Sequence, residues 1–283
     1  MKIWPGSGPD HSNKRPTMER AKQGGTTMEE KKTVAGATGG TLVNFVLLEQ
    51  PAFDREKLIR DLQSEWALPV NGEKEAPATG NVVFDDQGMI AAVALIDAPV
   101  PEGEAEQQAK TNYWWPQAVQ AAAAHKAHLL ITVLPQGQGS PVDAAKLLTK
   151  VSAAACGQPG ALGVMAAGTL LAPDFYRAVA DTMKEDVLPI LNWVYFGLWQ
   201  SEQGVCAYTY GLQDFELPEL EILHSARRPV ELRDLLVGLV MDLLEGDLEL
   251  AEGQVLAAGD GVPVPVSRSA GVAVEGESFK LGF

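Results

Sequence analysis

NVVFDDQGMIAAVALI, residues 81–96, contains two runs rich in β-branched and apolar residues on either side of Asp85-Asp86-Gln87-Gly88. Asp and Gly are the residues that a tight hairpin turn requires. The stretch therefore predicts two antiparallel strands, 81–84 and 89–96, joined by a hairpin. The segments that flank this hairpin indicate the kind of sheet to which it belongs.

Strand and helix patterns alternate around the hairpin. Before it, LVNFVLL at 42–48 has the length and β-branched content of a strand, and Asp54 can cap a helix that ends near Pro69. After it, a helical stretch from Glu104 to Ala124 is interrupted at Pro116, and a buried strand is expected over 128–133. The order is β-α-β-β-α-β, the split-βαβ or ferredoxin-like arrangement.

The rest of the chain nearly repeats this order. A connector helix over 141–155 begins at a capping box formed by Ser140 and Asp143. The expected elements after it are a strand (162–166), a helix (173–183), a hairpin (190–199 and 205–210), a strand (219–223), an amphipathic helix (229–244) and strands near residues 255, 272 and 279. We therefore predict an α+β fold: two split-βαβ (ferredoxin-like) halves, 41–135 and 136–283, packed as one body, with mostly antiparallel sheets and helices on one face.

Residues 1–40 differ from everything after them. They are rich in Lys, Arg, Gly, Thr and Pro and have no apolar periodicity, which predicts a disordered arm. Met18 and Met28 are internal methionines, so a start assigned too far upstream would also explain this arm.

The composition narrows the class of protein. The 283 residues are 46% hydrophobic and 21% charged, as in ordinary globular proteins, and the formal net charge is −15. Such a charge repels phosphate backbones and anionic membrane surfaces, so we expect neither a nucleic acid nor a membrane as partner. Because the chain has no apolar run long enough to cross a bilayer and no secretory signal, we expect a cytoplasmic location. The sequence does not specify an oligomeric state.

The sequence carries no signature of a metal or cofactor site. Cys156 and Cys206 do not form a CxxC motif, and we interpret both as small buried hydrophobes. His125 and His128 are close in sequence but lack the spacing of a zinc or facial-triad motif. The loop 135–140 lacks the third glycine of a dinucleotide-binding turn and the Gly-Lys-Ser/Thr of a P-loop. We therefore predict no metal and no cofactor.

Several segments together resemble one family. They are NYWWP from Asn112, HKAHLLITVL from His125, AAKLLTKVSAA from Ala144, ALGVMAAGTLLAPDFY from Ala161, LPILNWVYFGL from Leu188, YTYGLQDFELPELEIL from Tyr208 and RSAGVAVEGESFKLGF from Arg268. From Val43 to Phe283 the chain is similar to the bacterial family catalogued as domain of unknown function 4261, which has no assigned activity, cofactor or catalytic residue. The family usually has a glycine where this chain has Glu216-Leu217. It is therefore open whether the turn at these residues keeps a backbone conformation that favours glycine.

The remaining candidates for a functional site are aromatic and acidic. Aromatic residues gather in three segments, 113–115, 193–199 and 208–215, and carboxylates accompany the last one. Gly211 and Pro218 predict an exposed turn within 208–219, with surface carboxylates. Aromatic residues are first of all core material, but exposed beside carboxylates they form a protein-binding surface. The candidate binding residues are Asn112, Tyr113, Trp115, Trp193, Tyr195, Tyr208, Tyr210, Asp214 and Glu219.

Two functions remain compatible with these residues. The phrase around Gly211-Leu212 and Pro218-Glu219-Leu220 is also similar to one in suppressor-of-fused-like proteins and small bacterial families, some of which are immunity proteins. This likeness favours a non-catalytic module, immunity-like or regulatory, whose partner is another protein. The alternative is an enzyme acting on a small molecule, with Asp214 or Glu219 as acid or base in a cleft lined by Tyr113, Trp193 and Tyr210. No catalytic residue is assigned.

The arm is predicted to be dispensable for folding. Deleting residues 1–39 should leave the melting temperature unchanged within error, because the segment has neither apolar periodicity nor helix caps. Thermal unfolding of the full and shortened chains, followed by circular dichroism, measures this. A clear loss of cooperativity in the shortened chain would show that the arm contributes to the fold.

Overall fold

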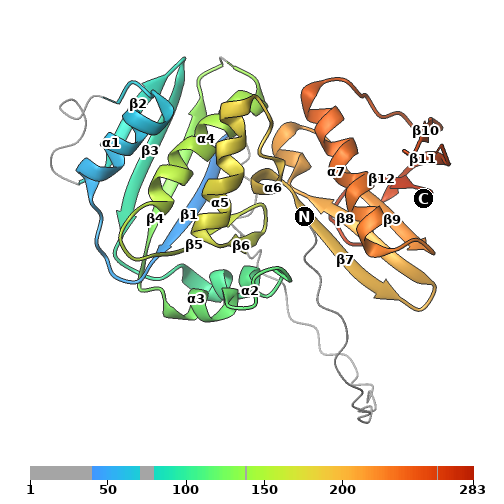
Figure 1. Ribbon diagram of the computed structural model, residues 1–283, viewed down its shortest axis with the longest axis horizontal. Helices are drawn as coiled ribbons and strands as arrows, with labels where there is room; N and C mark the ends of the chain where they lie inside the picture. Colours follow the sequence, from blue (N-terminus) through green and yellow to red (C-terminus); the bar gives the residue numbers. More distant parts are fainter. Residues whose placement is uncertain (1–39, 71–79, 138, 260) are drawn as a thin grey trace, which may run out of the picture. The chain divides into compact units, whose positions relative to one another are not determined.

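Two six-stranded sheets form the fold (Figure 1). The computed structural model describes residues 40–70, 80–137, 139–259 and 261–283, which belong to one compact unit. The predicted arm lies outside these residues except for Gly40. In the described ranges, no helix is both long and apolar enough to span a membrane.

The first sheet contains β1 (Leu42–Leu48), β2 (Val82–Asp86), β3 (Met89–Ile96), β4 (Ala127–Pro135), β5 (Ala161–Ala166) and β6 (Thr169–Leu171). The second contains β7 (Tyr195–Ser201), β8 (Gly204–Tyr210), β9 (Glu219–Ser225), β10 (Val255–Ala257), β11 (Pro263–Ala270) and β12 (Glu277–Leu281). The helices are α1 (Arg55–Trp66), α2 (Glu104–Ala109), α3 (Ala118–Ala124), α4 (Pro141–Cys156), α5 (Pro173–Ala180), α6 (Ile190–Trp193) and α7 (Pro229–Glu245), with short 3-10 turns η1 (Pro101–Gly103), η2 (Asp181–Glu185) and η3 (Leu212–Phe215). The predicted α+β class with mostly antiparallel sheets is confirmed.

The first sheet has the strand order β2-β3-β4-β1-β5-β6, and every neighbouring pair is antiparallel. The predicted hairpin is present, with Gln87 and Gly88 at φ 53° and 78° in its turn. A ferredoxin-like unit would place β1 beside β3, whereas here β4 lies between them. Ile96 at the end of β3 pairs with His128 at the start of β4, so the chain leaves β3 and enters β4 at the same end of the sheet. The segment with α2 and α3 therefore connects two adjacent antiparallel strands and is not a crossover connection.

The structure also corrects the division of the chain into halves. We expected the second half to begin at residue 136, but β5 pairs with β1 and β6 with β5, so both strands complete the first sheet. The two sheets separate between Leu171 and Tyr195. The physical reason is that the outer edge of β1 is free after β4 has paired with its other side, and the chain returns to it through α4.

Helices cover both faces of the first sheet, where we expected one face only. The helices α1, α4 and α5 pack on one face, and Val46 and Leu48 of β1 join the main core there. On the other face α2 and α3 pack against β5 and β6 around Leu47 and Met165. The part of that face formed by β3 and β4 is half-buried at Ile90 and exposed at Leu134.

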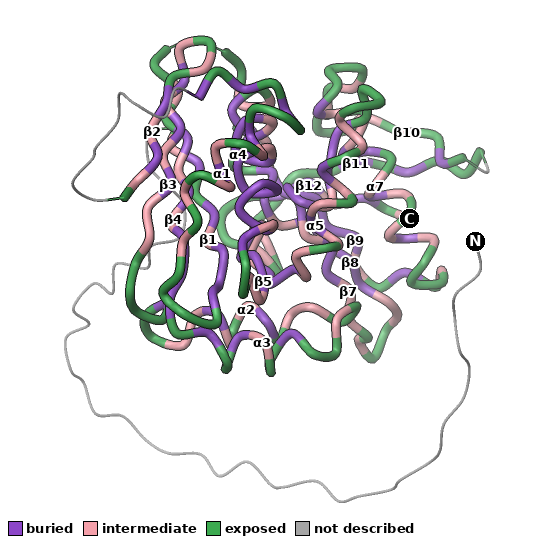
Figure 2. The backbone as a smooth tube through the Cα atoms, turned by 60° about the vertical axis from the view of Figure 1, so that its left-hand side comes forward, coloured by how far each residue is buried: buried purple, intermediate pink, exposed green. Residues whose placement is uncertain are grey.

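The second sheet has the order β10-β11-β12-β9-β8-β7, and β12 runs parallel to β9. The predicted amphipathic helix, α7, packs against β7 and β8 with Leu232, Leu236 and Val240 fully buried, and it ends at Gly246 as expected. Buried residues run from the first sheet through α4 and α6 into the second sheet, so one core joins the two sheets (Figure 2).

A buried polar network anchors β1 to the helices above it. The Asn44 side-chain amide donates to the hydroxyl oxygens of Ser152 in α4 and Tyr176 in α5, both at 3.1 Å. Tyr176 is fully buried, and burial raises the pKa of its hydroxyl well above the ordinary tyrosine value, so the group remains protonated. An amide in the core needs such acceptors, because an unpaired buried donor destabilises the fold.

Tyr176→Phe should lower the free energy of unfolding by about 1–2 kcal/mol, because it removes one acceptor from a buried amide without changing the volume of the ring. Urea unfolding at neutral pH measures the change. An unchanged unfolding midpoint would show that the Asn44 amide does not depend on this acceptor.

Candidate functional site

The aromatic residues of β7 and β8 lie on the face of the second sheet opposite α7. Side chains alternate along a strand, and the register pairs Tyr195 with Tyr210 and Gly197 with Tyr208. These residues therefore share one face with Trp199. The residues between them along β7 and β8 point toward the core that α7 covers.

Five aromatic rings follow one another across this face, and we call them the aromatic stripe: Trp199, Tyr208, Tyr195, Tyr113 and Trp114. Neighbouring ring centroids are 5.7, 6.0, 6.5 and 5.2 Å apart in this order, and each pair meets edge to face. Aromatic pairs prefer this geometry. Tyr113 is 48% and Trp114 45% exposed, and the other three are half-buried, so the stripe presents a contiguous aromatic surface.

The stripe depends on the absence of a side chain at Gly197. A Cβ atom added there would lie 2.0 Å from Cε1 of Tyr208, whose ring covers the glycine on the neighbouring strand. Glycine at this position therefore lets Tyr208 lie across β7 and contact Tyr195 on one side and Trp199 on the other.

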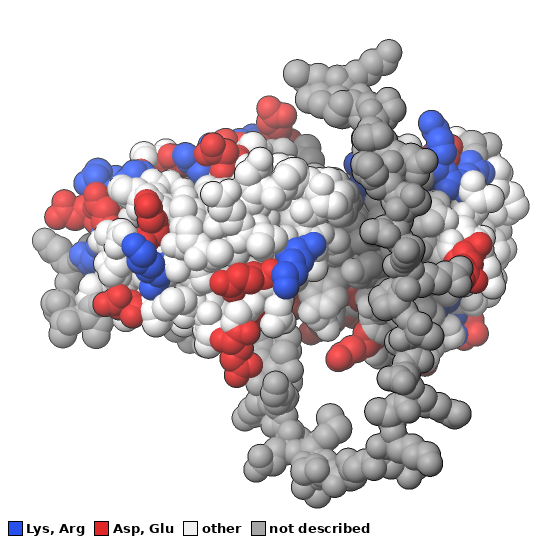
Figure 3. All heavy atoms as spheres, turned by 90° about the horizontal axis from the view of Figure 1, so that it is seen from below, with Lys and Arg blue, Asp and Glu red and all other residues white. Residues whose placement is uncertain are grey.

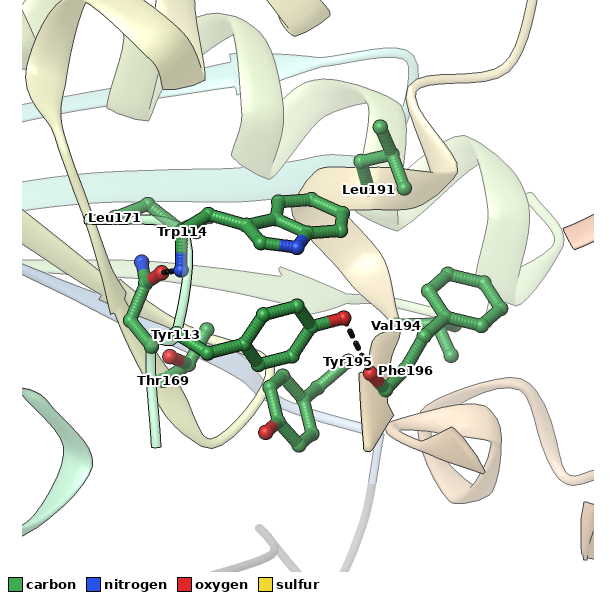
Figure 4. Close-up of a pocket in the computed structure, with 9 residues that line it drawn as sticks. Tyr113, Trp114, Thr169, Leu171, Leu191, Val194, Tyr195 and Phe196 are labelled. Atoms are coloured by element: carbon green, nitrogen blue, oxygen red, sulfur yellow. Dashed lines mark hydrogen bonds between the residues drawn. The ribbon is translucent and has the colours of Figure 1, made fainter. Parts of the chain in front are cut away.

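The loop Thr111–Trp115, which we call the clasp loop, joins the stripe to both sheets (Figure 4). The Asn112 side chain donates to the carbonyl of Leu170 in β6 (2.7 Å), and the Tyr113 hydroxyl donates to the carbonyl of Phe196 in β7 (3.1 Å). β6 and β7 are end strands of their sheets. The clasp loop thus satisfies a backbone carbonyl at the edge of each sheet.

Tyrosine hydroxyls complete this connection. The Tyr195 hydroxyl donates to the carbonyl of Thr111 (2.9 Å), and the Thr111 hydroxyl donates to Thr169 Oγ1 (2.9 Å). Burial raises the pKa of both Tyr113 and Tyr195 above the ordinary tyrosine value. Both phenols therefore remain protonated donors at neutral pH.

The clasp loop separates its two tryptophans. Asn112 Oδ1 accepts the backbone N–H groups of Trp114 (2.9 Å) and Trp115 (3.0 Å), which closes a tight turn. Trp114 lies outside this turn, with its ring edge to face with Phe175 of α5 and the Arg233 guanidinium of α7 5.8 Å from its ring centroid. Trp115, which we expected in the site, packs against the smaller core cluster under α2 and α3 instead.

A cavity of about 30 Å³ lies between Trp114 and the edges of the two sheets (Figure 4). Thr169 and Leu171 line it from β6, and Val194 and Tyr195 from the other side. The volume suits about one or two water molecules, far below the several hundred cubic ångströms of a typical ligand pocket.

Trp193 is a core residue, contrary to its place among the predicted binding residues. It ends the helical turn α6, where a strand was expected, so the alternation that leads to Tyr195 does not include it. Its indole N–H donates to Thr149 Oγ1 (2.7 Å), and its ring packs 5.4 Å from that of Phe215. Trp193 is only 7% exposed and contributes to packing.

Glu219 is also structural, and the expectation that it is a surface carboxylate is wrong. It is 7% exposed, and its carboxylate accepts the backbone N–H groups of Gly211 (2.7 Å) and Leu212 (2.9 Å) and the hydroxyl of Thr209 (2.6 Å). Burial raises the pKa of Glu219, while these hydrogen bonds act to lower it. The turn after β8 is thus closed by a side chain of β9.

Glu221, two residues further along β9, fixes a second loop over the same face. It is fully buried and accepts from the N–H groups of Val272 (3.0 Å) and Ala273 (2.6 Å), from the Ser278 hydroxyl (2.5 Å) and from Lys280 Nζ (2.7 Å). Burial acts to raise the pKa of Glu221, but these donors, the Lys280 ammonium above all, outweigh it and leave the pKa lowered. Because Tyr208 pairs with Glu221, this loop bounds the face on the β9 side of the stripe.

Asp214 is exposed, as predicted, but lies apart from the stripe. It lines a hollow of about 390 Å³ between the start of β1, the N-terminus of α4 and η3. Loss of hydration raises the pKa of its carboxyl group. Tyr113, Trp193 and Tyr210 are not among the residues that line this hollow. Nearby Glu216 has φ 61°, so its turn keeps a left-handed conformation without the expected glycine.

The histidines and cysteines have structural surroundings. His125 Nε2 accepts the N–H of Val100 (2.8 Å), and His128 Nδ1 lies 2.9 Å from the carbonyl of Ala98. Both cysteines are buried and free, and burial raises the pKa of Cys156 to about 12. Within the described residues, no three His, Cys, Asp or Glu side chains are grouped so as to hold a metal ion.

The structure brings together four of the nine predicted residues: Asn112, Tyr113, Tyr195 and Tyr208. Tyr210 shares their face but lies against Gly168, beyond the stripe. Sequence reasoning omitted Trp114 and Trp199 from the site. The spacing Tyr195-x-Gly197-x-Trp199 could have indicated Trp199, because alternate residues of a strand share a face.

Comparison with known proteins finds a family similarity in most of the second sheet. Residues 208–282 match the model of a family described as a domain of unknown function, DUF4261. This part of the chain is similar to the DUF4261 family. The DUF4261 match begins at Tyr208 in the stripe and extends through β9 and α7 to β12, so it includes Glu219 and Glu221 and excludes the clasp loop. No significant match is found among curated proteins or among solved structures.

The two carboxylates after β8 should differ sharply in their effect on stability. Glu219→Ala should lower the free energy of unfolding by about 3 kcal/mol, because it leaves the N–H groups of Gly211 and Leu212 buried without an acceptor. Asp214→Ala, at an exposed position, should cost about 1 kcal/mol or less. Urea unfolding of both variants measures the difference, and equal midpoints would contradict the structural role of Glu219.

Proposed function

We propose that this protein binds another protein through the aromatic stripe, as an immunity-like or regulatory module of the cytoplasm without catalysis at this surface. The observation that carries the proposal is the exposure of Tyr113 and Trp114 in one row with three half-buried aromatic side chains. Tyrosine and tryptophan dominate the energetics of protein interfaces, because they offer a large contact area at a low entropic cost.

The rigidity of the stripe also supports this proposal. The β7–β8 pairing holds Trp199, Tyr208 and Tyr195 in register, and the clasp loop holds the remaining two rings through bonds to both sheets. A surface that is ordered before binding loses little conformational entropy when a partner docks.

The alternative, an enzyme acting on a small molecule, requires an aromatic-lined cleft with a carboxylate. Asp214 and Tyr113 line different hollows, and Trp193 and Glu219 are buried in structural contacts. The residues of that hypothesis therefore do not share a pocket, and the geometry favours binding.

Surface charge gives no support to a nucleic acid as partner. On the face seen in Figure 3, acidic and basic side chains are interspersed around a broad uncharged area. With a net charge of −15, the protein repels polyanions at long range.

Affinity capture from the host, followed by identification of the proteins that co-purify, tests the proposal. Trp199→Ala and Trp114→Ala should each reduce the captured partner by about tenfold or more, because interface tryptophans contribute about 2 kcal/mol or more to binding. Val255→Ala is the matched control: it truncates an exposed apolar residue at the opposite end of the same sheet and should leave capture unchanged.

The melting temperature of each variant must first equal that of the wild type, so that a loss of capture reports on the surface. Capture of one partner that is indifferent to both tryptophan substitutions would refute the proposed function.

A further inference from the structure

The outer edge of β7 is not paired with another strand. β7 is the end strand of its sheet, and only β8 pairs with it in the described part of the chain. In an antiparallel pair, the backbone groups of alternate residues point to opposite sides. Because the Phe196 carbonyl points away from β8 to accept the Tyr113 hydroxyl, the backbone groups of Leu198 and Gln200 point away from β8 as well.

This edge lacks the features that usually prevent strand addition. Proteins protect sheet edges with proline, with charged side chains, with bulges or with a covering segment. The β7 sequence YFGLWQS contains neither proline nor a charged residue, and its register with β8 is regular. The clasp loop covers only the Phe196 end, whereas Leu198 is half-buried and Gln200 exposed.

The charge of the chain favours a basic partner at this free edge. Exposed Glu202 lies in the β7–β8 turn at one end of the edge. The formal net charge of the chain is −15, so long-range attraction favours a cationic partner.

The stripe itself already binds one cation. The Arg233 guanidinium lies over the Trp114 ring. A Lys or Arg side chain on a strand added beside β7 would meet Trp199 and Tyr208 in the same way, because alternate side chains of that strand would lie on the face of the stripe.

We propose that the partner of the aromatic stripe is an extended basic segment of another protein, which adds a strand to the outer edge of β7 and lays Lys or Arg side chains on Trp199 and Tyr208; this inference rests on the proposed function. Main-chain bonds to Leu198 and Gln200 supply affinity, and the aromatic face selects cationic side chains. A second copy of this chain suits the edge poorly, because each copy carries a net charge of −15 and would bring its own carboxylates to the contact.

The test uses end-blocked peptides of about eight residues that alternate Lys and Val, titrated into the full chain and followed by calorimetry. The added strand runs antiparallel to β7, as β8 does, so the residues directly opposite Leu198 and Gln200 exchange main-chain bonds with them and share their face of the sheet, away from the stripe. When the Lys side chains lie on the stripe, the Val amides therefore point at β7 and the Lys amides point away. Because Val and Lys amides point to opposite sides, a peptide methylated on its Val amides can be compared with one methylated on its Lys amides.

Methylation of the Val amide nitrogens should weaken binding by about tenfold or more, because at least two main-chain bonds are lost at about 1 kcal/mol each. Methylation of the Lys amide nitrogens should change the affinity by less than about threefold. Replacing every Lys by Glu should abolish binding, and higher salt should weaken the Lys–Val peptide. On the protein side, Leu198→Pro removes one outward N–H and should weaken binding as Val methylation does.

Equal affinity for the two methylated peptides, or for the Glu and Lys peptides, would overturn the proposal. A dimer would also overturn it, if sedimentation of the chain alone shows one and Leu198→Pro dissociates it. The edge would then be occupied by a second copy of the chain. If Trp199→Ala abolishes partner capture while Val methylation has no effect, the proposed function stands and this mode of binding fails. If capture is indifferent to Trp199→Ala, the proposed function itself fails.

Discussion

The hydrogen bonds from the clasp loop to the end strands of the two sheets are the interaction on which the rest of the structure depends. An end strand has backbone groups that face no neighbour, and leaving them buried without a partner is costly. Asn112 satisfies the carbonyl of Leu170 in β6, and Tyr113 satisfies that of Phe196 in β7. One short loop thus joins two sheets of different strand order. The same loop places two aromatic rings at the end of the row formed by β7 and β8.

Two buried carboxylates of β9 likewise provide acceptors for backbone N–H groups of nearby loops. Glu219 accepts two backbone N–H groups of the turn after β8, and Glu221 accepts two from the loop before β12. A carboxylate is a suitable acceptor for several donors because its two oxygens offer about four lone-pair sites. These acidic residues hold the loops that frame the aromatic face, and this role differs from that of a catalytic acid in a cleft.

The aromatic stripe and the free edge of β7 are two parts of one surface. Gly197 allows Tyr208 to lie across the strand whose outer backbone groups are free. The DUF4261 match contains β8 and β9, whereas β7 and the clasp loop precede it. The surface therefore combines strands inside the region similar to DUF4261 with segments that precede it.

Much of the local structure follows from residues near one another in the sequence. Asp54 caps α1, Ser140 and Asp143 close the capping box of α4, and Gly246 ends α7, because each signal acts within one turn of its own helix. The hairpins at 87–88 and 202–203 likewise follow from their turn residues.

The sequence by itself thus determined most of the elements, the α+β class and the aromatic segments from which the candidate site is built. Only the tertiary structure decided that β5 and β6 complete the first sheet, that Trp193 and Trp115 face the core while Trp114 faces solvent, and that Glu219 is a structural acceptor. The physical reason is that strand pairing and burial depend on which edges and faces remain free after distant segments have packed, and no local pattern of residues encodes that outcome.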